Sequence, residues 1–271
     1  MKGISNRYKS VLTIAGSDSG GCAGIQADIK SISACGAYAA SVITATTAQN
    51  TEGVFDIHPI PINNIEKQLD AVLTDIRFNS TKIGMLHSCE VMDLVRKKLK
   101  FYKNKNIVID PVMVATSGDK LIDDSAVNCI KNLLPMAEII TPNVPEAEIL
   151  IGNPITKDTI LDATKKIGKI YNTSVLLKGG HLESNSKEIV DVLYIKSMGD
   201  LVLVKNPRIN SINTHGTGCS LSSSIAAFLS LGFNIEDSVI KACRYVNKAI
   251  SKGSDMILGK GKGPINHFFL H

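Results

Sequence analysis

The chain has 271 residues, 44% of them apolar and 20% charged, which is ordinary for a globular protein and excludes a disordered, collagen-like or coiled-coil chain. The net charge of +5 comes from basic residues scattered along the sequence, whereas nucleic-acid binding usually shows a dense basic cluster. No stretch approaches the roughly 18 uninterrupted apolar residues of a membrane span. We therefore expect a chain that binds neither nucleic acid nor membrane.

The cysteines give no sign of a metal site or of a disulfide framework. They contain no C-x-x-C pair and no His–Cys spacing typical of zinc, so reduced thiols in the cytoplasm are the simplest expectation. The N-terminal apolar stretch, residues 11–15, is too short for the core of a signal peptide, and we expect no export. The six cysteines are Cys22, Cys35, Cys89, Cys129, Cys219 and Cys243.

Short β-branched runs alternate along the chain with longer segments of helical period. This alternation is typical of βαβ units, so we expect one α/β domain with a mainly parallel sheet and helices on its faces. No repeat or linker divides the chain, and the domain is expected to span residues 1–271. Buried strands are predicted over residues 11–15, 41–45, 81–85, 107–109, 138–141 and 174–177.

Two regions depart from this alternation. Residues 189–195 and 201–204 predict an antiparallel pair of strands. Residues 54–62 contain Pro59 and Pro61, and they predict an excursion off the sheet that could act as a lid.

Polar side chains follow several predicted strands at their carboxyl ends, where the ligand crevice of an open α/β sheet lies. Lys178 could supply a cation to the phosphates of a nucleotide, and Asp110 or Glu146 could hold Mg²⁺ directly or through water. Each of these could instead be a surface or capping side chain. Asn143 to Glu146, with Pro145 early in the segment, is also a plausible helix start.

The heptapeptide THGTGCS, residues 214–220, precedes a run of small and apolar residues that predicts a buried helix. Gly216 and Gly218 let the backbone turn and approach a ligand, while the N–H groups and dipole at a helix start favour an anion such as phosphate. A tight glycine-capped loop without a ligand is the alternative. The segment matches neither a Walker A loop nor G-x-G-x-x-G, so any phosphate must be bound by another arrangement.

A second glycine-rich segment, residues 16–28, leads into a helix and places Asp28 in the first turns of that helix. Asp28 could read the polar edge of a heterocycle, or it could be a surface carboxylate near a helix start. Gln49, after a strand of small residues, has the same two interpretations: a ligand contact or an ordinary loop amide.

Nine segments, in order, resemble the hydroxymethylpyrimidine/phosphomethylpyrimidine kinases of thiamine biosynthesis, a family of the ribokinase-like superfamily. The resemblance covers nearly the whole chain and implies a ribokinase-like three-layer sandwich. It also implies a homodimer that phosphorylates 4-amino-5-hydroxymethyl-2-methylpyrimidine to its monophosphate and then to its diphosphate, with MgATP as the donor. The segments are residues 12–18, 23–28, 48–51, 82–86, 110–113, 117–119, 141–143, 178–181 and 214–220.

The same resemblance implies a role for each candidate residue. Gln49 and Asp28 match positions that contact the aminopyrimidine, and Ala23 and Met85 match its apolar surroundings. The Mg-nucleotide side comprises Asn143, Lys178 and Thr217, with Asp110 and Glu146 as metal ligands. An anion hole is matched by Gly216, Thr217, Gly218 and Cys219, and Cys219 stands where many ribokinase-like enzymes carry an aspartate base.

Cys219 has two possible roles. A thiol at a helix N-terminus can have its pKa lowered from about 8.5, which would suit a proton acceptor, although adjacent phosphates oppose that shift. Otherwise Cys219 is a small buried thiol, and transfer depends on the backbone N–H groups and Mg²⁺.

One position departs from the family pattern. The residue before Ala23 is usually the second of two glycines, but here the pair is Gly21 and Cys22. If that position requires a positive φ, Cys22 costs about 1 kcal/mol and shifts the pyrimidine pocket, unless Gly20 absorbs the turn.

Two alternatives to this function stay open at the level of sequence. A pyridoxal kinase of the same superfamily performs the same chemistry on another ring, but Gln49, Met85 and residues 117–119 favour the pyrimidine. A non-catalytic pyrimidine-binding protein would keep the pocket without turnover. The intact set of Asp110, Glu146, Lys178 and residues 216–219 argues against it.

Overall fold

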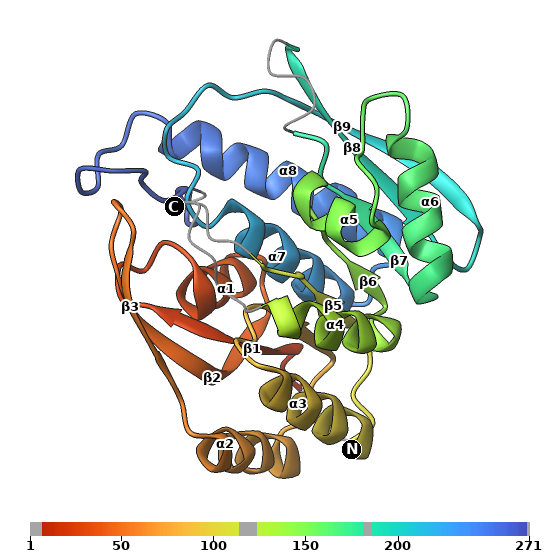
Figure 1. Ribbon diagram of the computed structural model, residues 1–271. Coiled ribbons are helices and arrows are strands. Elements are labelled where there is room, and N and C mark those ends of the chain that lie inside the picture. Colours follow the sequence, from red (N-terminus) through yellow and green to blue (C-terminus); the bar gives the residue numbers. More distant parts are fainter. Residues whose placement is uncertain (1–6, 114–123, 181–185, 270–271) are drawn as a thin grey trace, which may run out of the picture.

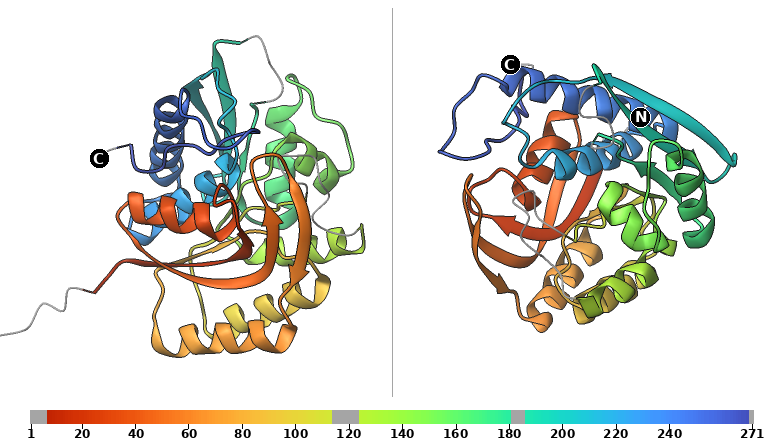
Figure 2. Two further views of the ribbon diagram at one scale, coloured as in Figure 1. Left: turned by 90° about the vertical axis from the view of Figure 1, so that its left-hand side faces the viewer. Right: turned by 45° about the horizontal axis from the view of Figure 1, so that its top comes forward.

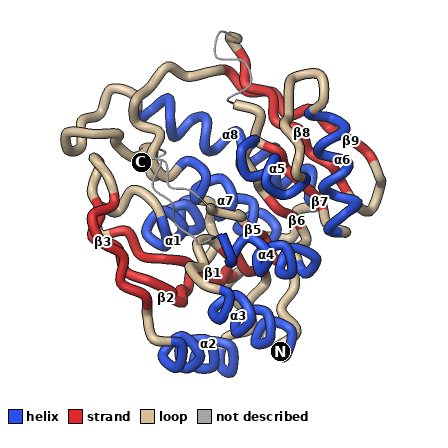
Figure 3. The backbone as a smooth tube through the Cα atoms, viewed as in Figure 1, coloured by secondary structure: helices blue, strands red, loops and turns tan. Residues whose placement is uncertain are grey.

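The computed structural model describes residues 7–113, 124–180 and 186–269, and its elements form a central sheet with helices on both faces (Figure 1). Two predicted features, residues 117–119 and His181, lie outside the described residues. Figure 3 shows the strands as one continuous layer between the helices. The predicted α/β class with a mainly parallel sheet is confirmed.

The sheet has nine strands in the order β3-β2-β1-β4-β5-β6-β7-β8-β9. Six neighbouring strands, from β2 through β7, run parallel, while β3, β8 and β9 are antiparallel to their neighbours. All six predicted buried strands and the antiparallel pair are present. Their bounds are β1 Ser10–Asp18, β2 Tyr38–Gln49, β3 Val54–Pro59, β4 Ser80–Ile83, β5 Ile107–Ile109, β6 Ile139–Ile140, β7 Ser174–Leu177, β8 Glu188–Ile195 and β9 Asp200–Pro207.

The predicted excursion off the sheet at residues 54–62 is wrong. Val54–Pro59 is β3, which pairs with β2 at the edge of the sheet, with Pro59 opposite Ala45. An edge strand tolerates proline because one side of its backbone has no neighbouring strand to bond.

The helices cover the two faces unequally. In Figure 2, α1 Gly24–Ala34, α7 Thr217–Ser230 and α8 Ile235–Gly253 lie on one side of the sheet. The other side carries α2 Ile62–Asp75, α3 Cys89–Phe101, α4 Asp124–Leu133, α5 Val144–Ile151 and α6 Ile160–Tyr171, with a short 3₁₀ turn, η1 Leu134–Met136, after α4.

Alternation along the strands divides the apolar side chains between two cores. Leu12 and Ile14 of β1 pack with α2 to α6, whereas Val11 packs with α1, α7 and α8. The same division separates Ile107 from Val108 in β5. Because successive strand residues point to opposite faces, a strand buried on both faces is apolar throughout, which is why these runs could be recognised.

The expectation that every thiol is reduced is wrong. Cys89 at the start of α3 and Cys129 in α4 form a disulfide, with Cα atoms 5.4 Å apart. Both residues pack against the same core because α3 and α4 lie on one face of the sheet. The other four cysteines carry free thiols.

Across the described ranges, every helix is too short or too polar to cross a lipid bilayer.

The C-terminal segment returns to the start of α7 through His267. Its Nε2 atom lies 3.0 Å from the Ser220 hydroxyl, and its backbone oxygen accepts a hydrogen bond from the Tyr245 hydroxyl at 3.0 Å. Burial, with a smaller effect of Lys30, lowers the pKa of His267 from its ordinary value of 6.5 to about 4.

We expect His267 to make the protein less stable at mildly acidic pH. Between pH 6.5 and about 4, His267 binds a proton in the unfolded chain but not in the folded chain. Its contribution to the free energy of unfolding is therefore complete above pH 6.5 and is lost as the pH falls towards 4. The loss from this group is at most about 3 kcal/mol. Urea titrations at several pH values should show a shallower acid loss in His267→Gln than in the wild type. The exposed His58→Gln variant should follow the wild type, and parallel curves for all three proteins would contradict this role.

Candidate functional site

A cavity of about 790 Å³ opens beyond the carboxyl ends of the parallel strands. Both glycine-rich loops line it, so the two ligand loops predicted from the sequence belong to one site. The lining includes eleven of the twelve predicted site residues: Ala23, Gln49, Met85, Asp110, Asn143, Glu146, Lys178, Gly216, Thr217, Gly218 and Cys219. Asp28 is the exception.

The turn before α7 directs the start of that helix at the cavity. Gly216 is the N-cap residue with φ of 80°, and no side chain caps the helix. The Thr217 hydroxyl instead donates to the Thr214 carbonyl at 2.6 Å. Because the first N–H groups of a helix have no partner within it, the start of α7 is a site for an anion.

Gly216 also packs directly against the first loop. A Cβ atom placed on it would overlap the carbonyl oxygen of Cys22. Glycine is therefore required at position 216 both by the positive φ and by the close approach of the two backbones.

Asp110 and Lys178 form the charged floor of one half of the cavity. Lys178 Nζ lies 3.2 Å from Asp110 Oδ1, which also accepts a hydrogen bond from the Thr141 hydroxyl at 3.0 Å. Burial alone would lower the pKa of Lys178, but Asp110 and Glu146 outweigh it and raise that pKa. Lys178 is thus held as a cation beside the start of α7.

Asn143 and Glu146 form a capping box at the start of α5. The Asn143 side chain accepts from the Glu146 N–H at 2.8 Å, and Glu146 Oε2 accepts from the Asn143 N–H at 2.9 Å. Burial, partly offset by Lys178 and reinforced by Asp110, raises the pKa of Glu146 to about 7. The predicted helix start and the predicted site residue are therefore the same group, a carboxylate that caps α5 while it is buried at the cavity.

Sequence reasoning missed Asp191 of β8. It lines the cavity, accepts a hydrogen bond from the Gly179 N–H at 2.9 Å, and has its pKa raised to about 6 by burial. Asp191 lies inside an antiparallel strand and not at a strand end, so the search of strand ends could not reveal it. Three carboxylates consequently surround Lys178, and carboxylate oxygens are the donors that Mg²⁺ prefers.

The other half of the cavity is formed by the first loop and β2. Asp18 organises the loop by accepting hydrogen bonds from the N–H groups of Gly20, Cys22 and Ala23, at 2.7 to 2.8 Å. The Gln49 amide nitrogen lies 3.0 Å from Nε2 of His215, which links this half to the turn before α7. Gln49 thus faces the cavity with its amide held by a neighbour.

The fold also brings three possible metal-ligand atoms, from Asp18, Cys22 and His215, within 4.8 Å of one another. No spacing in the sequence indicates this cluster, because His215 belongs to the second glycine loop. Each group already bonds within the loops: Asp18 to backbone N–H groups, Cys22 weakly to the Gly20 carbonyl, and His215 to Gln49.

The chain matches a known family over most of its length. The model of the family described as "Phosphomethylpyrimidine kinase" matches residues 18–266. The chain belongs to the phosphomethylpyrimidine kinase family. The hydroxymethylpyrimidine/phosphomethylpyrimidine kinase of Haemophilus influenzae is 44% identical over 265 residues, which cover 97% of this chain and 98% of that protein.

The thiamine biosynthesis bifunctional protein ThiED of Geobacter sulfurreducens is 45% identical, but the match covers 95% of this chain and 52% of that protein. The chain thus spans about half the length of this longer relative.

Solved structures agree with the family assignment. A Bacillus subtilis pyridoxal kinase in complex with ADP has a TM-score of 0.88 and 31% identity, over 97% of this chain and 99% of that one. The phosphomethylpyrimidine kinase of Clostridium difficile 630 has a TM-score of 0.77 and 41% identity, over 89% and 99%. The family resemblance, the ribokinase-like fold and the kinase function predicted from the sequence are confirmed. For the pyridoxal kinase alternative, the similarity shows only a related fold.

The departure of this chain from the family's first loop has no conformational cost. Gly21 takes the positive φ, at 77°, whereas Cys22 and Gly20 do not have positive φ. Cys22 is fully buried in the loop. The condition for strain at Cys22, a positive φ, is therefore not met, and the turn is made by Gly21 and not by Gly20.

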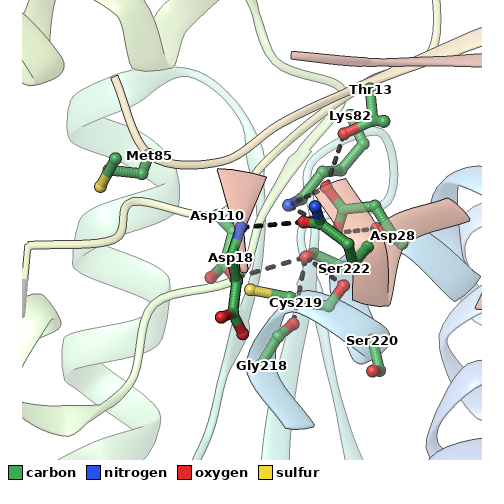
Figure 4. Close-up of polar contacts among 12 residues, drawn as sticks. Thr13, Asp18, Asp28, Lys82, Met85, Asp110, Gly218, Cys219, Ser220 and Ser222 are labelled. Carbon is green, nitrogen blue, oxygen red and sulfur yellow. Dashed lines mark hydrogen bonds and ion pairs between the residues drawn. The ribbon is translucent and has the colours of Figure 1, made fainter. Parts of the chain in front are cut away.

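Asp28 does not line the cavity, but it is bonded to Lys82, which does. Its side chain is fully buried, and both its oxygens lie 2.8 Å from Lys82 Nζ (Figure 4). Lys82 itself lines the cavity. The direct contact with the pyrimidine that the resemblance implied for Asp28 therefore has no path in this geometry.

Cys219 is a neutral thiol in this setting. Burial raises its pKa to about 11, Lys82 and the N–H of Gly24 lower it, and Asp28 and Asp110 raise it. The lowered pKa that a helix start can give is outweighed by burial.

We expect Gly216→Ala to damage both stability and activity. The alanine Cβ would meet the Cys22 carbonyl, so the two loops must separate, at a cost of about 2 kcal/mol or more beyond the strain of the positive φ. Gly199→Ala is the matched control, because Gly199 has φ of 74° and open space at its Cβ position. Urea denaturation and a kinase assay of both variants test this, and equal losses in the two would refute the interlocked loops.

Proposed function

We propose that this chain phosphorylates the hydroxymethyl oxygen of 4-amino-5-hydroxymethyl-2-methylpyrimidine and then converts the monophosphate to the diphosphate, with MgATP as the donor in both steps. One observation carries the proposal. A single cavity contains both the charged group of Asp110, Glu146 and Lys178 and the pocket of Ala23, Gln49 and Met85, and the start of α7 lines the same cavity. The Haemophilus influenzae relative bears the name of this double activity, and the Bacillus subtilis relative is described as an ADP complex.

The donor half suits the phosphates of ATP. Lys178 and the N–H groups at the start of α7 would neutralise phosphate oxygens, and Thr217 and Asn143 flank them. Asp110 and Glu146 would hold the Mg²⁺ that accompanies ATP, directly or through water, and this ion offsets the charge of the phosphates. A bound cation would favour the ionised form of Glu146 and so oppose the effect of burial on its pKa.

The acceptor half suits a small aminopyrimidine. Gln49 offers one amide donor and one acceptor to the ring edge, while Ala23 and Met85 supply apolar surface to the ring faces. This arrangement would direct the hydroxymethyl group at Cys219 and the start of α7. Phosphoryl transfer then depends mainly on placing the acceptor oxygen in line with the γ-phosphate.

We also propose that the chain is a single ribokinase-like domain that works as a homodimer in the cytoplasm. The unpaired edge of β3, with Phe55 69% exposed, supports strand-edge association of two copies. The mass of the protein in solution distinguishes one chain from two.

With MgATP, the purified protein should phosphorylate hydroxymethylpyrimidine much faster than pyridoxal, and it should form the diphosphate from the monophosphate. Gln49 and Met85 give the physical reason, because they provide the ring edge and face contacts. Removal of Mg²⁺ with a chelator should abolish all products. Chromatography of mono- and diphosphate products measures this, and a preference for pyridoxal would overturn the assignment, as would the absence of any phosphorylated product.

Cys219→Ala should lower kcat by about 100-fold or more while leaving pyrimidine binding nearly unchanged, as expected if the thiol takes part in proton transfer. Cys35→Ala, which removes another free thiol, should retain activity. Steady-state kinetics and calorimetric binding separate the two effects. Near-normal turnover in Cys219→Ala would show that Cys219 only fills space.

A further inference from the structure

Lys82 is a buried cation at the centre of the sheet that the proposed mechanism does not yet use. It lies in β4, its side chain is fully buried, and it is the bulkiest of the fully buried side chains in the described ranges. A buried charge is unfavourable unless it is paired, and apolar residues of the same volume usually stabilise a core as well or better. A purely structural role therefore gives little reason for a lysine here.

Asp28 is fully committed to holding Lys82. Its carboxylate accepts two contacts from Lys82 Nζ at 2.8 Å, one from the Thr13 hydroxyl at 2.5 Å and one from the Ser223 hydroxyl at 2.6 Å. With its lone pairs directed at these donors, Asp28 is poorly placed to accept a proton from a substrate. It is well placed to keep the lysine protonated.

The contact with Ser223 fixes the position of this pair relative to Cys219. Ser223 and Cys219 are four residues apart in α7, so their side chains lie on the same face of the helix, one turn from each other. The Asp28–Lys82 pair therefore lies against the turn of α7 that follows Cys219.

The lysine side chain is also directed at the carboxyl end of the sheet. A Cβ atom on Gly84, two residues after Lys82, would lie 2.7 Å from Lys82 Nζ, so the glycine leaves the space that the ammonium group occupies. Lys82 and Cys219 both line the cavity. The matched segment KIGML thus combines a lysine with the glycine that lets its head group reach the site.

The charges around Cys219 come from four parts of the fold besides its own helix: β4, α1 and the segments after β5 and β7. Lys82 of β4 lowers the pKa of Cys219, as does the N–H of Gly24 in α1, whereas Asp28 of α1 and Asp110 after β5 raise it. The effect is reciprocal, because Cys219 raises the pKa of Lys82. Lys178, after β7, is the second cation, because Cys219 raises its pKa as well, but it is paired with Asp110 in the donor half of the cavity.

We infer that Lys82 is a positioning residue of the transfer reaction: its ammonium group, held by Asp28, stabilises negative charge on the sulfur of Cys219. This inference rests on the proposed function. Cys219 first loses its proton to solvent. The acceptor oxygen then bonds to the γ-phosphorus, the bond to the bridging oxygen breaks and ADP leaves, and the hydroxyl proton passes to the thiolate and restores the thiol.

The test compares Lys82→Met with Lys82→Met/Asp28→Asn, which leaves no unpaired charge, and with the exposed control Lys97→Met. Lys82→Met should lose about tenfold or more in kcat, and the double variant should lose less, because it also removes the Asp28 charge that raises the pKa of Cys219. In both, KM for the pyrimidine should change by less than about threefold. Lys97→Met should match the wild type. Melting temperatures show which variants are folded. If Lys82→Met does not fold, the double variant, which leaves no unpaired charge, still tests the inference.

Two further measurements separate this role from a structural one. In a Cys219→Ala background, Lys82→Met/Asp28→Asn should add little further loss of kcat, because both changes act on one step. The alkylation rate of Cys219 by iodoacetamide at fixed pH, followed by mass spectrometry, should fall in Lys82→Met. Full additivity with Cys219→Ala, or an unchanged alkylation rate in the folded variant, would overturn the inference.

The alkylation measurement requires no turnover. If the wild type phosphorylates no pyrimidine, the proposed function fails while the link between Lys82 and Cys219 is still tested. If the wild type is active but alkylation is unaffected by Lys82→Met, only the role of Lys82 fails.

Discussion

The active site depends on the backbone contact between Gly216 and the carbonyl of Cys22. The contact joins the loop after β1 to the turn before α7, which are almost two hundred residues apart in sequence. It sets the distance between the acceptor pocket, formed by the first loop, and the helix start that would receive the phosphates. His215 next to Gly216 adds a side-chain link to Gln49, so the two halves of the cavity are joined at a second point.

Helix α7 connects two separate charge clusters through adjacent serines. Ser222 donates to Asp110 at 3.3 Å, and Ser223 donates to Asp28 at 2.6 Å. The first carboxylate belongs to the donor half with Lys178, and the second holds Lys82 beside Cys219. Serine is a modest helix former, so its use at two successive buried positions is explained better by these hydrogen bonds than by helix propensity.

Features that depend on a local sequence pattern could be predicted from the sequence. Features that depend on contacts between distant parts of the chain could not. The apolar runs of β1, β5 and β7 and the start of α5 were predictable because burial on both faces and helix capping act within a few residues. The strand β3 was not, because its proline, Pro59, is tolerated only at a sheet edge, and a sequence does not show which strand lies at the edge. The Cys89–Cys129 disulfide and the Lys82–Asp28 pair depend on which helix packs beside which strand, and Asp191 enters the site from the middle of an antiparallel strand.

A thiol at position 219 fits the surrounding charge better than a carboxylate would. Asp28 and Asp110 already raise the pKa of Cys219, and a third buried carboxylate beside them would be costly to ionise next to phosphates. A thiol is mostly neutral at neutral pH, so it adds little negative charge beside the phosphates while substrates bind. Its weakness is the small fraction of thiolate at neutral pH, and a buried lysine against the same helix turn is the group that can offset this weakness without contacting the phosphates.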